Sequence, residues 1–182
     1  GKTAVSGSAD GTLKVWDVAA RQEMATLKGH TRGVRRMAFS SNGRTLATSS
    51  DDKTVKLWSL AAGRRPGVLR GSPVNGFSAL AISPDSRLLA AGGNDGTVKL
   101  WDAATERETA VLPGHRRPVS CVAFSPDGKL VATGTGFWNQ AEAPSELSLW
   151  DVATRREMMH LKQEHALFSL AFSPDGRTLA SA

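Results

Sequence analysis

The sequence contains a single cysteine, Cys121, among its 182 residues, so no disulfide bond can form within the chain. A lone thiol in the apolar run VSCVAF is typical of a small core residue, and the lack of disulfides favours a reducing compartment. No run approaches the eighteen or so consecutive apolar residues of a membrane span. The first residues, GKTAVSGSADG, lack the charged-then-apolar order of a signal peptide. We therefore expect a cytoplasmic location and no membrane span; the lack of an initiator Met predicts a larger parent chain.

The sequence also has no helical stripe of apolar residues longer than a turn or two. Instead, short apolar runs such as VAFS are followed by Ser-Pro-Asp-Gly, which supplies Pro and Asp for a type I turn and Gly for its exit. A second short run, an Asp-Gly or Asp-Lys hairpin and the alternating phrase TVKLW come next. With 40% hydrophobic and 22% charged residues, the chain is predicted to be globular and all-β.

One phrase ending in tryptophan occurs four times, as TLKVW, TVKLW, TVKLW and ELSLW. The tryptophans are Trp16, Trp58, Trp101 and Trp150. Successive copies are 42, 43 and 49 residues apart, and related phrases such as AFSPDGKLVATGT precede them. A unit of about 43 residues with four short strands cannot bury both faces of its sheet alone, so neighbouring units must stack.

These phrases, together with the Gly-His pairs between them, resemble the WD-repeat β-propeller family across the whole chain. The resemblance implies four-stranded antiparallel blades around a central channel, with the Gly-His turn leading into the innermost strand. It also implies a network of a turn His, a second-strand Ser or Thr, a hairpin Asp and the third-strand Trp. One such set is complete in this sequence: His30, Thr48, Asp52 and Trp58.

The resemblance implies two incomplete sets as well. Ser72 and Ala91 replace two members beside Asp95 and Trp101. In the fourth unit the hairpin Asp is lost to an insertion, and the remaining members are His115, Thr133 and Trp150. The set with Ser72 and Ala91 is therefore expected to be the loosest clamp.

The repeats divide the chain into periods of similar length. Because GRTLASA at the end restates GKTAVSG at the start, the chain holds four periods and begins a fifth. An open end leaves unpaired strand edges, so we expect the remaining blades of a ring to come from further sequence or from a second copy. The predicted periods are 1–42, 43–85, 86–127 and 128–175, with 176–182 starting the next.

Ser, His and Asp occur together in the network, which raises the alternative of a hydrolase triad. A triad needs one exposed nucleophile with donors for the oxyanion, and no such elbow is present. Recurrence in successive units favours structure, since a protein needs one active site but many clamps. His160 and His165 flank Glu164 at a spacing that matches no zincin helix. We expect no enzyme activity, no cofactor and no metal site, and keep hydrolysis as a minor alternative.

The formal net charge is +6, and basic residues recur in register in the loops of one predicted face, at Arg44, Arg87, Lys129 and Arg177 among others. Acidic residues share these loops, and no aromatic residues lie between the basic ones. This pattern favours a solvated rim of mixed charge over a nucleic-acid or membrane footprint. A polyanion-binding surface is kept as a minor alternative.

The opposite predicted face carries the Gly-His turns and the hairpins between second and third strands. The turn aspartate lies 16 residues before the tryptophan in the third unit and 23 residues before it in the fourth, so the fourth hairpin has seven extra residues. The insertion brings two adjacent aromatics close to Arg-rich turns, as in an interface hot spot. Folding of these aromatics onto their own blade is the alternative. The predicted partner-binding residues are Phe137, Trp138, Arg116, Arg117, Arg32 and Arg35.

Together these features predict a non-catalytic interaction scaffold that binds protein or peptide partners through the face of the Gly-His turns and hairpins. A sensor or regulatory module of a larger enzyme or signalling protein is the alternative. The further blades that such a segment needs are expected from a longer parent chain or from self-association.

Overall fold

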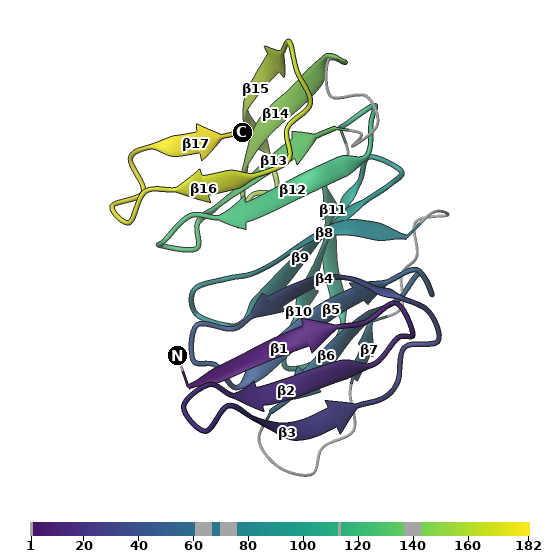
Figure 1. The fold of residues 1–182 in the computed structure, drawn as a ribbon. Helices are drawn as coiled ribbons and strands as arrows, with labels where there is room; N and C mark the ends of the chain where they lie inside the picture. The colour runs from purple at the N-terminus through teal and green to yellow at the C-terminus, as the bar shows by residue number, and fades with distance from the viewer. Residues whose placement is uncertain (1, 61–66, 70–75, 113, 137–142) are drawn as a thin grey trace.

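The computed structural model describes residues 2–60, 67–69, 76–112, 114–136 and 143–182. Within this part all regular structure is β-strand, in five antiparallel sheets that follow one another along the chain (Figure 1). The prediction of an all-β fold is confirmed. The first two sheets contain β1 (Thr3–Gly7), β2 (Leu13–Asp17) and β3 (Gln22–Leu27), then β4 (Val34–Phe39), β5 (Thr45–Ser50), β6 (Val55–Ser59) and β7 (Gly67–Leu69).

The third and fourth sheets are complete four-stranded meanders, in which each strand pairs with the strand before and after it. The fifth sheet has two strands. The third sheet contains β8 (Phe77–Ile82), β9 (Leu88–Gly93), β10 (Val98–Asp102) and β11 (Glu108–Leu112). The last two sheets contain β12 (Val119–Phe124), β13 (Leu130–Thr135), β14 (Ser145–Asp151), β15 (Glu157–Gln163), β16 (Leu170–Phe172) and β17 (Leu179–Ser181).

A hydroxyl-centred turn joins the first strand of a sheet to the second. In the third sheet, Ser83 Oγ donates to the carboxylate of Asp85 at 2.6 Å, and the backbone N–H of Leu88 donates to Ser83 Oγ at 2.9 Å. The same pattern recurs around Ser125 and Ser173. These turns are the Ser-Pro-Asp phrases of the sequence, followed by Gly128 and Gly176 in two copies and by Ser86 in the third sheet, and they act as the local signals that end one strand and start the next.

The hydrophobic core lies between sheets, because each cluster of buried residues combines two neighbouring sheets. Leu69 of the second sheet packs with Phe77 and Trp101 of the third. Leu100 of the third sheet packs with Trp150 of the fourth. Trp58, Trp101 and Trp150 thus each pack against the preceding sheet, which explains why a tryptophan recurs in successive units.

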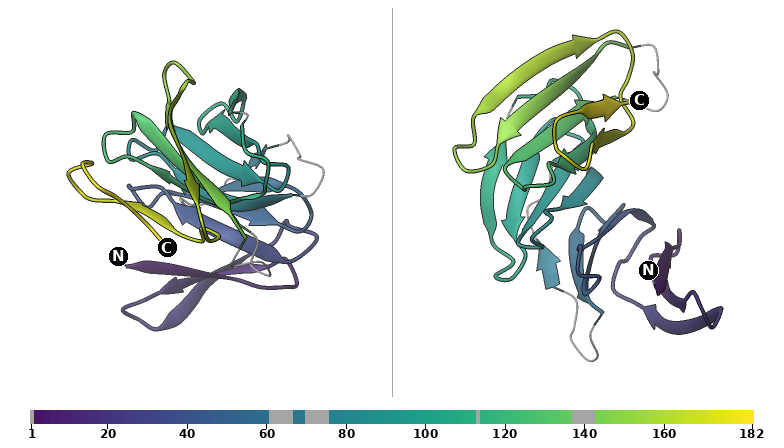
Figure 2. Two further views of the ribbon diagram at one scale, coloured as in Figure 1. Left: turned by 90° about the horizontal axis from the view of Figure 1, so that it is seen from above. Right: turned by 90° about the vertical axis from the view of Figure 1, so that its left-hand side faces the viewer.

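Seen from two further directions, the sheets are successive layers of one curved arc (Figure 2). The contacts of β4 with β8, of β8 with β12 and of β12 with β16 show that the first strands of the sheets are adjacent. The sheets are stacked side by side, and no described sheet is closed on itself. Among the described residues, no helix is long and apolar enough to cross a membrane.

Two faces result from this arrangement. One, here called the hairpin face, carries the turns into β4 and β12 and the hairpins β1–β2, β5–β6, β9–β10 and β13–β14. The other, here called the rim face, carries the turns between first and second strands and those between third and fourth strands. On the hairpin face, a Cβ on Gly96 would clash with the carbonyl oxygen of His115, and the φ of Gly96 is +84°. The hairpin glycine lets one blade pack against the Gly-His turn of the next.

Candidate functional site

The second sheet contains a buried chain of hydrogen bonds that links its strands to the turn before β4. The indole Nε1 of Trp58 lies 2.8 Å from Thr48 Oγ1, which lies 2.7 Å from His30 Nε2. On the other side of the ring, His30 Nδ1 lies 2.8 Å from the carboxylate of Asp52. That carboxylate also accepts the backbone N–H of Thr31. The chain clamps the turn to the hairpin.

The donors and acceptors of this chain assign the tautomer of His30. An indole only donates, so Thr48 Oγ1 accepts from Trp58 and directs its own hydrogen to His30 Nε2. His30 Nδ1 then carries the hydrogen and donates it to Asp52. With a neutral His30, every hydrogen-bonding group of the chain has a partner, and no proton is positioned for transfer to a substrate.

The ionisation of the pair follows from its burial and hydrogen bonds. Burial lowers the pKa of His30, although Asp52 opposes this shift, and the ring is neutral near pH 7. For Asp52, burial raises the pKa, but hydrogen bonds from Thr54, His30 and the Thr31 backbone outweigh it and lower the pKa to about 2. A charged carboxylate thus holds a neutral imidazole, which suits a structural clamp.

The third sheet lacks this chain. Trp101 is fully buried, but among the described residues its Nε1 has no hydrogen-bond partner. Ala91 occupies the position of Thr48 in β9, which removes the hydroxyl that would accept from the indole. The carboxylate of Asp95 bonds within its own hairpin, to the backbone N–H and hydroxyl of Thr97. Ser72, the other substituted member, lies outside the described residues.

In the fourth sheet a glutamate takes the place of the hairpin aspartate. Trp150 Nε1 lies 3.0 Å from Thr133 Oγ1, which lies 2.7 Å from His115 Nε2. His115 Nδ1 lies 3.1 Å from the carboxylate of Glu146, which also accepts the Arg116 backbone N–H at 3.3 Å. The sequence predicts that this set is incomplete because it has lost its aspartate; the structure corrects this expectation, since Glu146 completes the chain.

The position of Glu146 shows how the replacement works. It lies four residues before its tryptophan, where the other units have a threonine such as Thr97. The side chain of glutamate is long enough to bring its carboxylate to the histidine. Glu146 also pairs with Lys162, and Ser145 with Gln163, so the end of the insertion lengthens β14 and β15. The insertion therefore supplies its own clamp residue.

One arrangement in this sheet has the residue types of a catalytic triad. Ser148 Oγ lies 3.0 Å from His160 Nδ1, and Glu157 lies 3.1 Å from the same nitrogen. A triad needs the nucleophile and the carboxylate on different ring nitrogens, and Ser148 is fully buried. The group therefore cannot activate a nucleophile. Within the described parts of the chain, no three His, Cys, Asp or Glu side chains are placed to hold a metal ion.

The hairpin face is hollowed over the first three sheets. A depression of about 1130 Å³ is lined by Thr31, Arg32, Arg35, Asp51 and Lys53, among others. Arg35 Nε lies 2.7 Å from Asp51, so its charge is partly neutralised. Arg32 makes no ion pair with any described side chain. Arg32 and Arg35 thus lie together on the predicted face.

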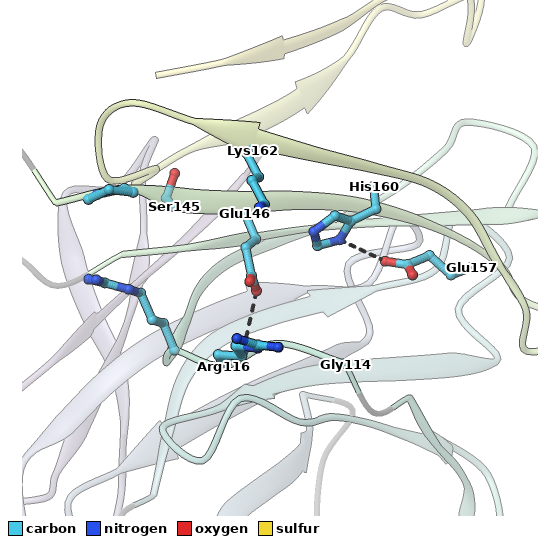
Figure 3. Close-up of a pocket in the computed structure, with 9 residues that line it drawn as sticks. Gly114, Arg116, Ser145, Glu146, Glu157, His160 and Lys162 are labelled. Atoms are coloured by element: carbon cyan, nitrogen blue, oxygen red, sulfur yellow. Dashed lines mark hydrogen bonds and ion pairs between the residues drawn. The ribbon is translucent and has the colours of Figure 1, made fainter.

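A second hollow, of about 530 Å³, lies beside Glu146 (Figure 3). Arg116 lies across from Glu146, and His160 and Glu157 lie to one side. Arg116 and Arg117 both line this hollow. Phe137 and Trp138, the aromatic residues of the predicted site, lie outside the described residues. The two predicted pairs of arginines therefore belong to separate hollows.

Repeated four-stranded antiparallel meanders, stacked face to face with a tryptophan between layers, define a β-propeller. The family model described as WD domain, G-beta repeat matches residues 1–17, 21–59, 63–102, 106–140 and 157–182. The chain belongs to the WD40 repeat family, as its repeats predict.

Other proteins contain similar segments. A structure of a mitotic checkpoint complex matches all of this chain and 56% of its own, with a TM-score of 0.88 and 25% identity. Centriole proteome protein 16 of Chlamydomonas reinhardtii is 34% identical over 37% of this chain and 5% of its own length. Pre-mRNA-splicing factor PRP46 of Debaryomyces hansenii is 51% identical over 20% of this chain and 9% of its own. Nuclear distribution protein PAC1 of Mycosarcoma maydis is 42% identical over 25% and 10%.

The chain thus spans about half the length of the matched checkpoint chain. It spans a tenth or less of each of these curated relatives.

Proposed function

We propose that this chain is a non-catalytic scaffold that binds protein or peptide partners through its hairpin face. WD40 propellers are generally scaffolds, and the matched structure is that of a protein complex. The relatives bear the names of centriole, splicing and nuclear distribution proteins, which supports a cytoplasmic or nuclear place of action.

The hollows on the hairpin face are the observation that carries this proposal. They hold Arg32, Arg116 and Arg117 on rigid turns that the clamps position. Arginine is enriched at interface hot spots, and pre-positioned side chains lose less entropy on binding. Phe137 and Trp138, which lie outside the described residues, stand in the sequence between β13 and β14, shortly before the residues of β14 that line the second hollow.

Two alternatives lead to different observations. A sensor module of a larger enzyme would bind a partner domain of its own parent chain, so the mass of the native gene product separates it from a free scaffold. A polyanion-binding surface would lose affinity steeply with salt. The acidic residues Asp51, Glu146 and Glu157 in the hollows favour a partner of mixed charge over a polyanion.

Site-specific cross-linking tests the face directly. A photoreactive side chain is placed at Arg32, at Arg116 and, as a matched control, at the exposed Arg44 of the rim face. Binding through the hairpin face predicts cross-links to a common partner from positions 32 and 116 that exceed those from position 44. Equal or stronger cross-linking from position 44 would contradict the proposed face.

A further inference from the structure

The fourth sheet lacks an ion pair that two other sheets share. In the first sheet Lys14 Nζ lies 2.7 Å from Glu23, and in the third Lys99 Nζ lies 2.8 Å from Glu108. Each lysine lies two residues before its tryptophan, and each glutamate pairs across the strands with that tryptophan. The lysine side chain therefore reaches the outermost strand of its own sheet, β3 in the first sheet and β11 in the third.

Ser148 occupies the lysine position in the fourth sheet, while the glutamate is retained as Glu157. Glu157 instead contacts His160 at 3.1 Å, and Ser148 contacts the same ring nitrogen at 3.0 Å. Ser148 itself is fully buried, and its short side chain cannot reach Glu157 as the lysines reach their glutamates in the other sheets. The hollow of about 530 Å³ lies here, beside Glu157 and His160.

The charged groups around this hollow are unevenly paired. Both carboxylates are already engaged, Glu146 by His115 and the Arg116 backbone, and Glu157 by His160. The side chains of Arg116, Arg117 and Lys162 line the same hollow. Among the described residues, none of these three cationic side chains makes an ion pair. Their hydrogen-bond donors are available to a ligand.

We propose that this hollow binds carboxylate side chains of an acidic peptide segment in the partner. The proposal deepens, and rests on, the proposed scaffold function. An arginine offers a planar fork that matches a carboxylate, and Lys162 adds a point charge from the neighbouring strand. Such charge-assisted hydrogen bonds gain strength where the groups are partly removed from water.

The chemistry of the lining favours a peptide over a nucleic acid. No described lining residue is aromatic, so bases would have no stacking platform. Glu146 and Glu157 would repel the continuous row of phosphates of a nucleic acid. The carboxylates of a peptide are spaced apart, so they can contact the cationic side chains without lying next to these glutamates. The hollow is also smaller than the depression over the first three sheets, as a site for one or two side chains requires.

Fluorescence anisotropy of the full chain with three labelled peptides tests the occupant. The peptides alternate glycine with glutamate, glutamine or lysine, so they differ only in charge and its sign. The glutamate peptide should bind at least about tenfold more tightly than the glutamine peptide. Binding no tighter than that of the glutamine peptide, or preference for the lysine peptide, would overturn the proposal.

Matched variants separate the hollow from the general positive charge. Arg116→Gln and Lys162→Gln should each weaken glutamate-peptide binding about three- to tenfold, while Arg44→Gln on the rim face removes the same charge without effect. Equal losses in all three would mean non-specific attraction and would overturn the site. Denaturant melts establish that each variant is folded.

A third variant distinguishes binding in the hollow from non-specific attraction to positive charge. Ser148→Lys restores the lysine that reaches the glutamate in the other sheets, so we expect it to narrow the hollow beside Glu157 and His160 while adding a positive charge. Narrowing the hollow weakens glutamate-peptide binding, whereas bulk electrostatics strengthens it. Stronger binding in this variant would overturn the proposal. If these peptide tests fail while partner cross-links from positions 32 and 116 still exceed those from position 44, the scaffold function stands without the acidic-peptide site, so the two proposals fail separately.

Discussion

At the scale of single residues, each clamp depends on hydroxyl and carboxylate groups that are satisfied only together. Thr48 accepts from Trp58 and donates to His30, and Asp52 accepts from the opposite side of the ring. Removing an acceptor from such a buried chain leaves donors without partners, which costs more than the lost bond itself. Single substitutions in the complete chain should therefore have large effects on stability.

Asp52→Ala and Asp95→Ala are a matched pair for this point. Asp52→Ala removes the acceptor of His30 and of the Thr31 backbone, and should lower the free energy of unfolding by about 1–3 kcal/mol. Among the described residues, Asp95 bonds within its exposed hairpin, to the backbone and hydroxyl of Thr97, so Asp95→Ala should cost less. Urea melts of both variants give the comparison; equal losses would contradict the role of the network.

The ionisation of His30 and Asp52 predicts a loss of stability in acid. His30 has a folded pKa below its ordinary 6.5, so the unfolded chain binds more protons as the pH falls below about 6.5, and stability decreases. Asp52 has a folded pKa of about 2 against 3.8, so its contribution is present above pH 3.8 and is lost between there and pH 2. Both lowered pKa values therefore make the free energy of unfolding decrease as the pH falls.

Urea melts at about pH 7.5, 5.5 and 3 should therefore show steadily decreasing stability. Asp52→Asn should reduce the loss below pH 4, because it removes one of the carboxylates whose pKa is lowered. Part of the loss should remain in this variant, since turn aspartates such as Asp85 and Asp127 also have lowered pKa values through their serine hydrogen bonds. Higher stability at pH 5.5 than at 7.5 would contradict the sign of the histidine effect.

At the scale of elements, the β13–β14 hairpin shows how an insertion can keep the clamp. Its last residues extend β14 and β15 by two cross-strand pairs and bring Glu146 to His115. Burial raises the pKa of Glu146, but hydrogen bonds from His115 and the Arg116 backbone outweigh this and lower it. A charged Glu146 thus does the work of Asp52 from a position two residues closer to the tryptophan.

Glu146→Ala should therefore destabilise the fourth sheet by about 1–3 kcal/mol, because it leaves His115 Nδ1 and the Arg116 N–H without their acceptor. The control is Glu164→Ala, which removes the same charge from an exposed position and should have little effect on the free energy of unfolding. Urea melts of the two variants provide the measurement. If Glu146→Ala left the free energy of unfolding unchanged, the carboxylate of Glu146 would not stabilise this clamp, which would contradict the prediction.

The sequence predicts the sheets because their signals are local and repeated. The Ser-Pro-Asp-Gly turns, the Asp-Gly hairpins and the phrases ending in tryptophan each determine a turn or strand within a few residues. Glu146 escapes prediction because its role depends on side-chain length and on the extension of β14, and no other unit has a glutamate there. The sequence shows that Ser148 stands where other units have a lysine. That this removes an ion pair with Glu157 can be seen only once the pairing of β14 with β15 is known.

At the scale of the whole molecule, the two ends of the arc differ from its middle. In the described part, β1 pairs with β2 alone and β17 with β16 alone. Three large apolar side chains on or near first strands are 39–45% exposed: Met37, Phe39 and Phe168. Unpaired strand edges and exposed apolar surface promote association.

This chain on its own should therefore self-associate or bind an apolar dye. Light scattering after size-exclusion chromatography, together with dye fluorescence, measures both properties. We expect a mass above that of one chain, 19.3 kDa, or strong dye binding. A monodisperse species of 19.3 kDa without dye binding would contradict the expectation that further blades or a second copy complete the surface.

Binding through the hairpin face is the central claim, and the affinity of one variant tests it most directly. Trp138→Ala removes an aromatic side chain from the inserted hairpin, and a hot-spot residue of this kind contributes about 2 kcal/mol or more. Calorimetry with a partner identified by cross-linking should show a dissociation constant raised about 30-fold or more, with an unchanged urea melt. An unchanged dissociation constant, or a variant that unfolds, would contradict the claim and make the insertion a structural feature.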